Sequence, residues 1–143
     1  MAGGVTRLVL VIACALIDGE NKVLLTRRPP GKTMAGLWEF PSGKCETGET
    51  PEDCLIRELR EELAIAVASR DLTPLCFASH RYGPAEGDFH LLMPLYVCRN
   101  WQGVCRALEG QNLAWVRPAH LRDYPMPAAD APLIGPLQKF LAE

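Results

Sequence analysis

The sequence predicts an α+β or α/β layered domain. Three observations lead to this prediction: apolar runs with strand character, a well-capped amphipathic stretch between them, and a second helical stretch near the C-terminus. No internal repeat, low-complexity tract or long linker interrupts the 143 residues. We therefore expect one domain that spans residues 1–143.

The first apolar run has two interpretations. Residues 7–19, RLVLVIACALIDG, imitate a secretory signal, with a basic residue, an apolar run and an A-x-A-like ACA. The same run suits a buried strand at 8–17, followed by a turn at DGEN and a second strand at 22–27 as a hairpin. We favour the strand, because removing the run would take away the partner of the second strand. The run is too short to span a membrane.

The remaining elements follow from periodicity and from turn residues. We expect, in chain order, a loop at 29–36, a short apolar piece at 37–40, a loop at 41–49, a helix at 51–63, strands at 75–80, 90–98 and 113–116, and a last helix at 133–141.

Composition and charge exclude some classes of partner. With 48% hydrophobic residues, 22% charged residues and a net charge of −2, the chain has no broad basic field for DNA or RNA. An anionic ligand must therefore be held by a few local cations or by a metal ion. The six cysteines form no CxxC pair and no zinc spacing, which indicates reduced thiols in a cytoplasmic protein. We expect no nucleic acid polymer and no membrane as partner.

The central helix is well marked at its start. Thr50 is a good N-cap, Pro51 suits the first helical position, and Glu52 and Asp53 favour the positive end of the helix dipole. One arc of this helix is apolar and should face the core; it consists of Leu55, Ile56, Leu59 and Leu63.

The acidic residues beside that arc allow two interpretations. Glu58, Glu61 and Glu62 form a solvated face with an internal ion pair between Arg57 and Glu61, which is usual for a run of charges. Alternatively, they bind a hard divalent cation, since Mg²⁺ takes oxygen ligands. The like charges of Glu58 and Glu62, four residues apart, favour a nearby cation.

The stretch from Gly43 onward resembles the signature of the Nudix hydrolases, G-x5-E-x7-R-E-U-x-E-E-x-G-U, where U is aliphatic. Gly43, Glu49 and RELREELAI fit it at every defining position except the last glycine, which is Ala64 here. The resemblance implies an α/β/α sandwich of the α+β class, with a mixed sheet between helices. It also implies a loop–helix–loop that binds Mg²⁺ and a nucleotide diphosphate. If position 64 needs a positive φ, alanine costs about 1 to 2 kcal/mol there.

The resemblance implies roles within the signature. Arg57, Glu58 and Glu61 are the expected catalytic residues. Glu61 and Glu62 are expected to be metal ligands. Glu58 is expected to be a further ligand or the base that orients the attacking water. Arg57 is expected to orient a glutamate, and Glu49 to cap the helix or to act as an outer acid.

Outside the signature, LLTRRPP, AGLWEFPSGK, EGQNLAW and DYPMPAADAPLI resemble the MutT-like branch, which cleanses nucleotide pools. Arg28 is then expected to contact phosphate, and Lys44 to lie beside the diphosphate, although either residue alone reads as surface charge. The carbonyl of Ser42, where relatives have glycine, and the carboxylate of Glu109 are expected metal ligands.

The base-binding end is less well defined. Phe40 and Leu133 are expected to help line the base pocket. Asp130 stands where an asparagine is expected in the oxidised-guanine enzymes, and Phe89 where a basic residue is expected. An ionised aspartate accepts hydrogen bonds only, from a guanine edge, from N7–H of 8-oxoguanine or from the cytosine amino group. The alternative is that Asp130 caps the last helix.

The resemblance implies hydrolysis of a nucleoside triphosphate to the monophosphate and pyrophosphate, assisted by Mg²⁺, with Mn²⁺ as a possible substitute. Two substrates compete: 8-oxo-dGTP, removed to avoid mutation, and CTP with other modified nucleotides. A Nudix module that binds nucleotides without catalysis is a third possibility, but such a module would be expected to lack signature acids. We expect a monomer or a homodimer.

Overall fold

The structure is a computed structural model that describes residues 7–32 and 34–142. Its strands and α-helices are β1 (Arg7–Leu16), β2 (Val23–Arg27), β3 (Trp38–Glu39), β4 (Ser42–Lys44), α1 (Pro51–Leu63), β5 (Thr73–Tyr82), β6 (Phe89–Cys98), β7 (Asn112–Val116) and α2 (Ile134–Leu141). Short 3₁₀ helices lie at Ser69–Asp71, Pro84–Glu86, Pro118–Asp123 and Ala131–Leu133. Within the described residues, no helix is long and apolar enough to cross a membrane.

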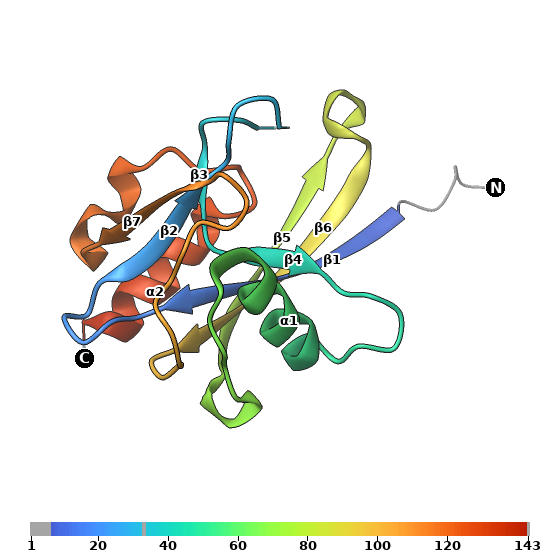
Figure 1. The fold of residues 1–143 in the computed structure, drawn as a ribbon. Helices are drawn as coiled ribbons and strands as arrows, with labels where there is room; N and C mark the ends of the chain where they lie inside the picture. The colour runs from blue at the N-terminus through green and yellow to red at the C-terminus, as the bar shows by residue number, and fades with distance from the viewer. Residues whose placement is uncertain (1–6, 33, 143) are drawn as a thin grey trace.

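The strands form two sheets (Figure 1). The larger sheet has the order β4-β1-β6-β5, and it is mixed because β1 and β6 run parallel while the other pairs are antiparallel. The smaller sheet has the order β3-β2-β7 and is antiparallel. Only Phe40 and Pro41 separate β3 from β4, so the chain passes directly from one sheet to the other.

Strand β1 separates two cores, because successive side chains of a strand point to opposite faces. Ala13 and Ala15 belong to one core, which also contains Leu137 of α2. Cys14 belongs to the other core, which contains Leu59 of α1. The two α-helices therefore cover opposite faces, and the predicted α+β sandwich is confirmed.

Helix α1 begins and ends as its local chemistry predicts. The hydroxyl of Thr50 accepts a hydrogen bond from the N–H of Asp53 at 3.1 Å, and Pro51 is the first helical residue. At the other end Ala64 has φ 60°, and its N–H donates to the carbonyl of Arg60 at 3.1 Å. The position that is glycine in the signature is thus left-handed in this chain too.

Two predictions about strands are wrong. The stretch 41–49 was expected to be a loop, but it contains β4, in which Gly43 pairs with Ile12 of β1. Ser-Gly-Lys has little strand propensity, so the free edge of β1 decides this structure. The predicted hairpin of the first two strands is limited to a single bridge between Ile17 and Val23, because β2 pairs with β3 and β7.

Candidate active site

One cavity of about 370 Å³ collects carboxylates from distant parts of the chain. Glu58 and Glu62 come from α1, Glu39 from β3, and Glu109 from the segment before β7. We call it the acidic cavity. The basic side chains in its wall are Arg28, Lys32 and Lys44.

A second cavity, of about 290 Å³, adjoins the first and has a different lining. We call it the apolar cavity. Its apolar wall consists of Val9, Val11, Met34, Leu91, Met93 and Pro127. Tyr82, Phe89 and Asp130 also line it and add aromatic and polar groups.

The two cavities meet along a shared wall, which consists of Arg28, Glu39, Ser42, Gly43 and Lys44. In this wall the guanidinium of Arg28 lies 3.1 Å from the carboxylate of Glu39. Burial raises the pKa of Glu39, and the Arg28 charge partly opposes that shift. A ligand with an anionic end and an apolar end can therefore occupy both cavities at once, with its middle at this pair.

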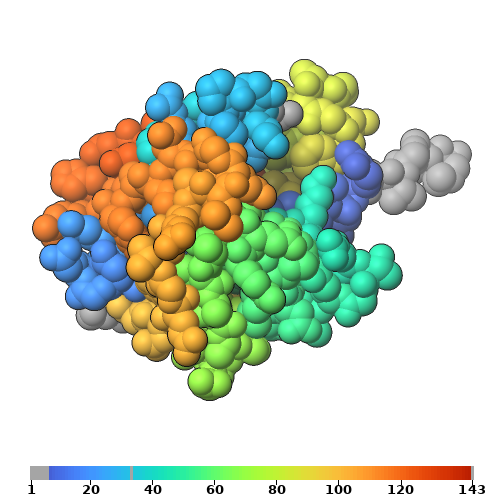
Figure 2. Space-filling model, in the orientation of Figure 1, coloured from blue at the N-terminus to red at the C-terminus, as the bar shows by residue number. Residues whose placement is uncertain are grey.

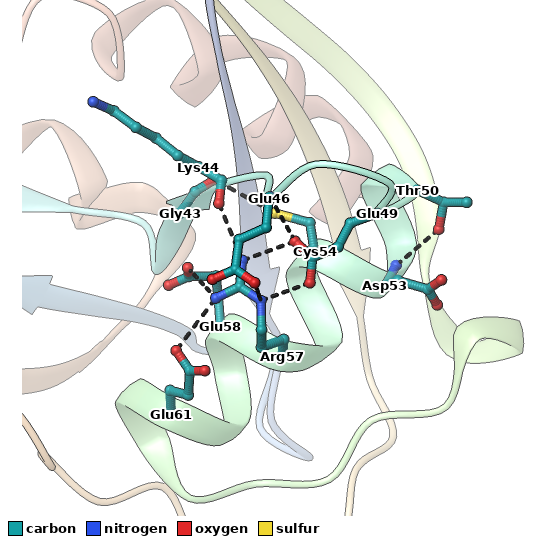
Figure 3. Close-up of polar contacts among 10 residues, drawn as sticks. All are labelled: Gly43, Lys44, Glu46, Glu49, Thr50, Asp53, Cys54, Arg57, Glu58 and Glu61. Atoms are coloured by element: carbon teal, nitrogen blue, oxygen red, sulfur yellow. Dashed lines mark hydrogen bonds and ion pairs between the residues drawn. The ribbon is translucent and has the colours of Figure 1, made fainter.

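Arg57 organises the acids of α1 and of the preceding loop (Figure 3). Its Nε lies 2.6 Å from Oε2 of Glu49 and its Nη2 lies 2.9 Å from Oε1, so the pair is bidentate. Its Nη1 donates to Glu58 at 2.8 Å and to Glu61 at 3.3 Å, and its Nη2 donates to the carbonyl of Lys44 at 3.1 Å. The hydrogen bond from Arg57 is the largest cause that lowers the pKa of Glu49 to about 2.

Gly43 makes room for the carboxylate of Glu58. A Cβ on residue 43 would lie 2.0 Å from Cδ of Glu58, far inside van der Waals contact. Any side chain at residue 43 would displace this carboxylate, which Arg57 also holds through a hydrogen bond of 2.8 Å. Glu58 is thus fixed at the wall of the acidic cavity.

The acids within the cavity repel one another. Burial, a hydrogen bond with Glu58 and the nearby charges of Glu58, Glu109 and Glu39 raise the pKa of Glu62 well above its usual range. Over residues 7–32 and 34–142, no three His, Cys, Asp or Glu side chains converge closely enough to hold a metal ion. The oxygen donors nevertheless suit a hard cation such as Mg²⁺, whose charge would relieve this repulsion.

Glu109 reaches the cavity because its segment is tied to the end of α1. The carbonyl of Glu62 accepts from the N–H of Leu108 at 3.1 Å and from the side chain of Gln111 at 3.1 Å. Figure 2 shows this segment, in orange, packed against the green surface of α1. A residue about fifty positions away in the chain thus joins the acids of the signature helix.

Asp130 lines the apolar cavity and is only 2% exposed. It accepts a long hydrogen bond, 3.4 Å, from the N–H of Phe40. Burial, followed by the charge of Glu39, raises the pKa of Asp130 to about 7. The alternative that Asp130 caps the last helix is wrong, because its side chain makes no capping bond within the described residues.

Six of the predicted site residues line the acidic cavity: Arg28, Ser42, Lys44, Glu58, Glu62 and Glu109. Arg57 lies behind them, holding Glu58. Glu61 forms the ion pair with Arg57 instead, and its side chain is 55% exposed. Figure 3 shows Lys44 extending away from Arg57.

Phe40 and Leu133 do not line the apolar cavity as expected. Both side chains are fully buried in the core that contains α2, and neither belongs to the cavity wall. Phe40 contributes through its backbone, since its N–H donates to Asp130. The aromatic groups of the wall are Tyr82 and Phe89, on adjacent strands.

Sequence reasoning missed Glu39 and Tyr82. Glu39 sits between Trp38 and Phe40, and a carboxylate within such an apolar piece is the signal that could have identified it. Tyr82 carries no comparable signal. It reaches the cavity because it pairs with Phe89 at the end of the β5–β6 ladder.

Comparison with known proteins gives matches over nearly the whole chain. A family model described as a NUDIX domain matches residues 12–135. The CTP pyrophosphohydrolase of Escherichia coli (strain K12) is 36% identical over 131 residues, covering 92% of this chain and 90% of that protein. The 8-oxo-dGTP diphosphatase of the same organism is 35% identical over 132 residues, covering 91% and 97%.

Solved structures show the same likeness. The solution structure of the E. coli ORF135 protein matches with a TM-score of 0.81 and 29% identity, covering 98% of this chain and 96% of that chain. A structure of MutT, from work on Aliivibrio salmonicida and Vibrio cholerae, matches with a TM-score of 0.77 and 27% identity, covering 94% and 99%.

Proposed function

Because the chain belongs to the Nudix hydrolase family, we propose that it is a Mg²⁺-dependent nucleoside triphosphate pyrophosphohydrolase, with 8-oxo-dGTP as the first candidate substrate. Membership makes it a hydrolase of phosphorus anhydrides, and the family and fold predicted from the signature are confirmed. Nudix hydrolases act on nucleotides and generally use divalent metal ions. We propose that this chain acts as a single Nudix domain that releases the monophosphate and pyrophosphate and so cleanses the nucleotide pool of the cytoplasm.

The observation that carries the proposal is the pair of adjoining cavities. A nucleoside triphosphate is anionic at one end and carries a flat, largely apolar base at the other. The acidic cavity suits the phosphates because Arg28, Lys32 and Lys44 line it, and the apolar cavity suits the base. The Arg28–Glu39 pair in the shared wall then lies near the sugar and the first phosphate.

Within this proposal, the chain's own residues divide the chemistry. Gly43 and Arg57 hold the carboxylate of Glu58, which orients the attacking water or takes its proton. Arg28, Lys32 and Lys44 offset phosphate charge. Ser42, through its carbonyl, and Glu58, Glu61, Glu62 and Glu109 are the proposed metal ligands. A bound divalent cation supplies neutralisation of the polyphosphate and a lower pKa for the attacking water.

A Glu58→Gln variant tests this division. The proposal predicts a fall in kcat of roughly 10²- to 10⁴-fold for pyrophosphate release with Mg²⁺, since a positioned carboxylate is lost. Glu46→Gln is the matched control, because Glu46 lies on the same network at 3.7 Å from Arg57 but is 69% exposed and outside the cavity wall. Full activity of the Glu58→Gln protein would remove Glu58 from the mechanism.

Asp130 supports 8-oxo-dGTP once its pKa is considered. With a pKa of about 7, the carboxyl exists in both forms near neutral pH. A protonated carboxyl donates to a purine carbonyl with one oxygen and accepts from a ring N–H with the other. The raised pKa thus compensates for the absence of the asparagine expected at this position.

A second candidate is pyrophosphohydrolysis of CTP. It is favoured by the 36% identity with the E. coli CTP pyrophosphohydrolase and by the acceptor that Asp130 offers when it is ionised. Ionised Asp130 would accept from the cytosine amino group. An Asp130→Asn variant separates the candidates through the ratio of kcat/KM for 8-oxo-dGTP and CTP. We expect that ratio to change about tenfold, since a mispaired buried acceptor costs about 1 to 3 kcal/mol. An unchanged ratio would show that Asp130 does not read the base.

A further inference from the structure

Tyr82 lines the apolar cavity, and its hydroxyl is buried close to Asp130. Tyr82 ends β5, is only 6% exposed, and lines the cavity together with Asp130. Its oxygen accepts a hydrogen bond from the N–H of Ala129 at 3.1 Å, the residue directly before Asp130. The phenol oxygen therefore lies next to the group that we propose to read the base.

Within the described residues, the hydroxyl of Tyr82 accepts a hydrogen bond but does not donate one. A phenol both accepts and donates, and the Ala129 N–H uses only an acceptor site. In the part of the chain that the structure describes, no side chain or carbonyl accepts a hydrogen bond from Tyr82. Burial, the largest cause, raises the pKa of Tyr82, so the proton stays in place at neutral pH. A buried donor without an acceptor destabilises the protein, and an acceptor on a bound ligand would remove that penalty.

The ring is fixed in one orientation. It lies 5.2 Å from the ring of Phe89 at an interplanar angle of 33°, and 4.5 Å from the ring of His80 in an edge contact. Tyr82 and Phe89 also form a cross-strand pair. With two rings packed against the side chain and its oxygen bonded to Ala129, the hydroxyl is pre-organised, so a ligand bond to it needs little further ordering.

We propose that Tyr82 is a specificity-determining residue that donates its phenolic hydrogen to an acceptor on the nucleobase, while Asp130 bonds the neighbouring edge. The inference rests on the proposed function, because it assigns the apolar cavity to the base. It selects bases that present an acceptor beside the group bound by Asp130, as guanine, 8-oxoguanine and cytosine do. Tyr82 takes no part in the phosphate chemistry, which lies in the other cavity.

A Tyr82→Phe variant removes the hydroxyl and keeps the ring. We expect kcat/KM for 8-oxo-dGTP, dGTP and CTP to fall about tenfold for each substrate that the protein uses, with the loss in KM. The matched substrate is abasic 2′-deoxyribose 5′-triphosphate, for which kcat/KM should not change. The dissociation constants of 8-oxo-dGMP and CMP, measured by calorimetry without metal, should rise by a similar factor.

A positioning role through Ala129 is separated by repeating the change in an Asp130→Ala background, where residue 130 has no polar side chain to be positioned. If Tyr82 donates to the base itself, Tyr82→Phe still costs about tenfold there. A loss that disappears in this background, an equal loss on the abasic substrate, or no loss at all would overturn the inference. A wild-type protein that hydrolyses no triphosphate would instead contradict the proposed function, and the dissociation constants would then decide the role of Tyr82.

Discussion

The phosphate end and the base end of the site are built differently. At the phosphate end Glu58 and Glu62 come from one helix, Arg57 on the same helix holds Glu58, and Glu39 and Glu109 join them from other parts of the chain. The base end is assembled from β1, β5, β6 and the segment before α2, and its polar groups, Asp130 and Tyr82, are buried with incomplete hydrogen bonding. The difference indicates that the phosphate end is suited to one chemistry, whereas the base end is adjustable by single substitutions.

Gly43→Ala should have the largest effect, and it should act mainly through Glu58 at the phosphate end. The new Cβ would meet Cδ of Glu58 at 2.0 Å and displace the carboxylate, so kcat should fall roughly 10²- to 10⁴-fold, as for loss of Glu58 itself. Gly48→Ala is the control in the same loop: its φ of 86° makes alanine cost about 1 kcal/mol, but no described atom lies within 4 Å of the added Cβ. Comparable kcat in both variants would contradict the role given to Gly43.

Asp130→Asn should change the pH dependence of stability at the base end. The pKa of Asp130 is about 7 in the folded protein and roughly 4 when unfolded, so the folded state binds the extra proton between these values. The free energy of unfolding of the wild type therefore falls as the pH rises from about 4 to about 7.

The asparagine variant lacks this titration. Its free energy of unfolding relative to the wild type should rise by roughly 3 kcal/mol over the same interval, as measured by urea denaturation at each pH. Other titrating groups cancel in this difference. A difference that does not vary with pH would show that Asp130 is not buried as an acid.

Arg57→Lys tests whether the several hydrogen-bond donors of the Arg57 guanidinium matter or only its positive charge. Lysine cannot bridge Glu49, Glu58 and the carbonyl of Lys44 together, so kcat at saturating Mg²⁺ should fall about 10- to 100-fold. Arg60→Lys, on the same helix and exposed, should be neutral. Wild-type kcat in the Arg57→Lys protein would reduce Arg57 to a source of positive charge.

Ala64→Gly should have the smallest effect and should leave kcat unchanged. Alanine at φ 60° is strained, so glycine should stabilise the fold by about 1 kcal/mol and raise Tm by about 3 °C. Ala66→Gly, at a residue outside the left-handed set, should lower stability by roughly 0.5 to 1 kcal/mol. Calorimetry distinguishes these signs, and a lower Tm for Ala64→Gly would be the contrary result.

The same contrast explains what the sequence could predict. Helix α1 and its acids follow from local rules, because capping at Thr50 and the apolar arc act within a few residues. The expected ion pair of Arg57 with Glu61 was also confirmed. Strand β4 was missed, because the edge of β1 and not the residues of β4 determines it.

At the base end fewer of the predicted residues lie in the cavity wall. Phe40 and Leu133 were expected in the pocket wall, but both side chains lie in the core that contains α2. The packing of α2 decides which hydrophobic side chains enter the core and which line the cavity, and local sequence patterns do not encode that packing. Tyr82 enters the cavity through its register with Phe89, which depends on a pairing of distant residues. Long-range contacts of this kind decide the base end, and of the three predicted base-pocket residues only Asp130 lines the cavity.

The most direct test of the proposed function is kcat/KM for 8-oxo-dGTP, dGTP, CTP and dCTP with Mg²⁺, measured from the release of pyrophosphate. We predict hydrolysis with a preference for 8-oxo-dGTP over dGTP of about 100-fold or more, which corresponds to about 2.7 kcal/mol. No release of pyrophosphate from any of the four would contradict the proposed function, and a preference for the cytosine nucleotides would contradict 8-oxo-dGTP as the substrate.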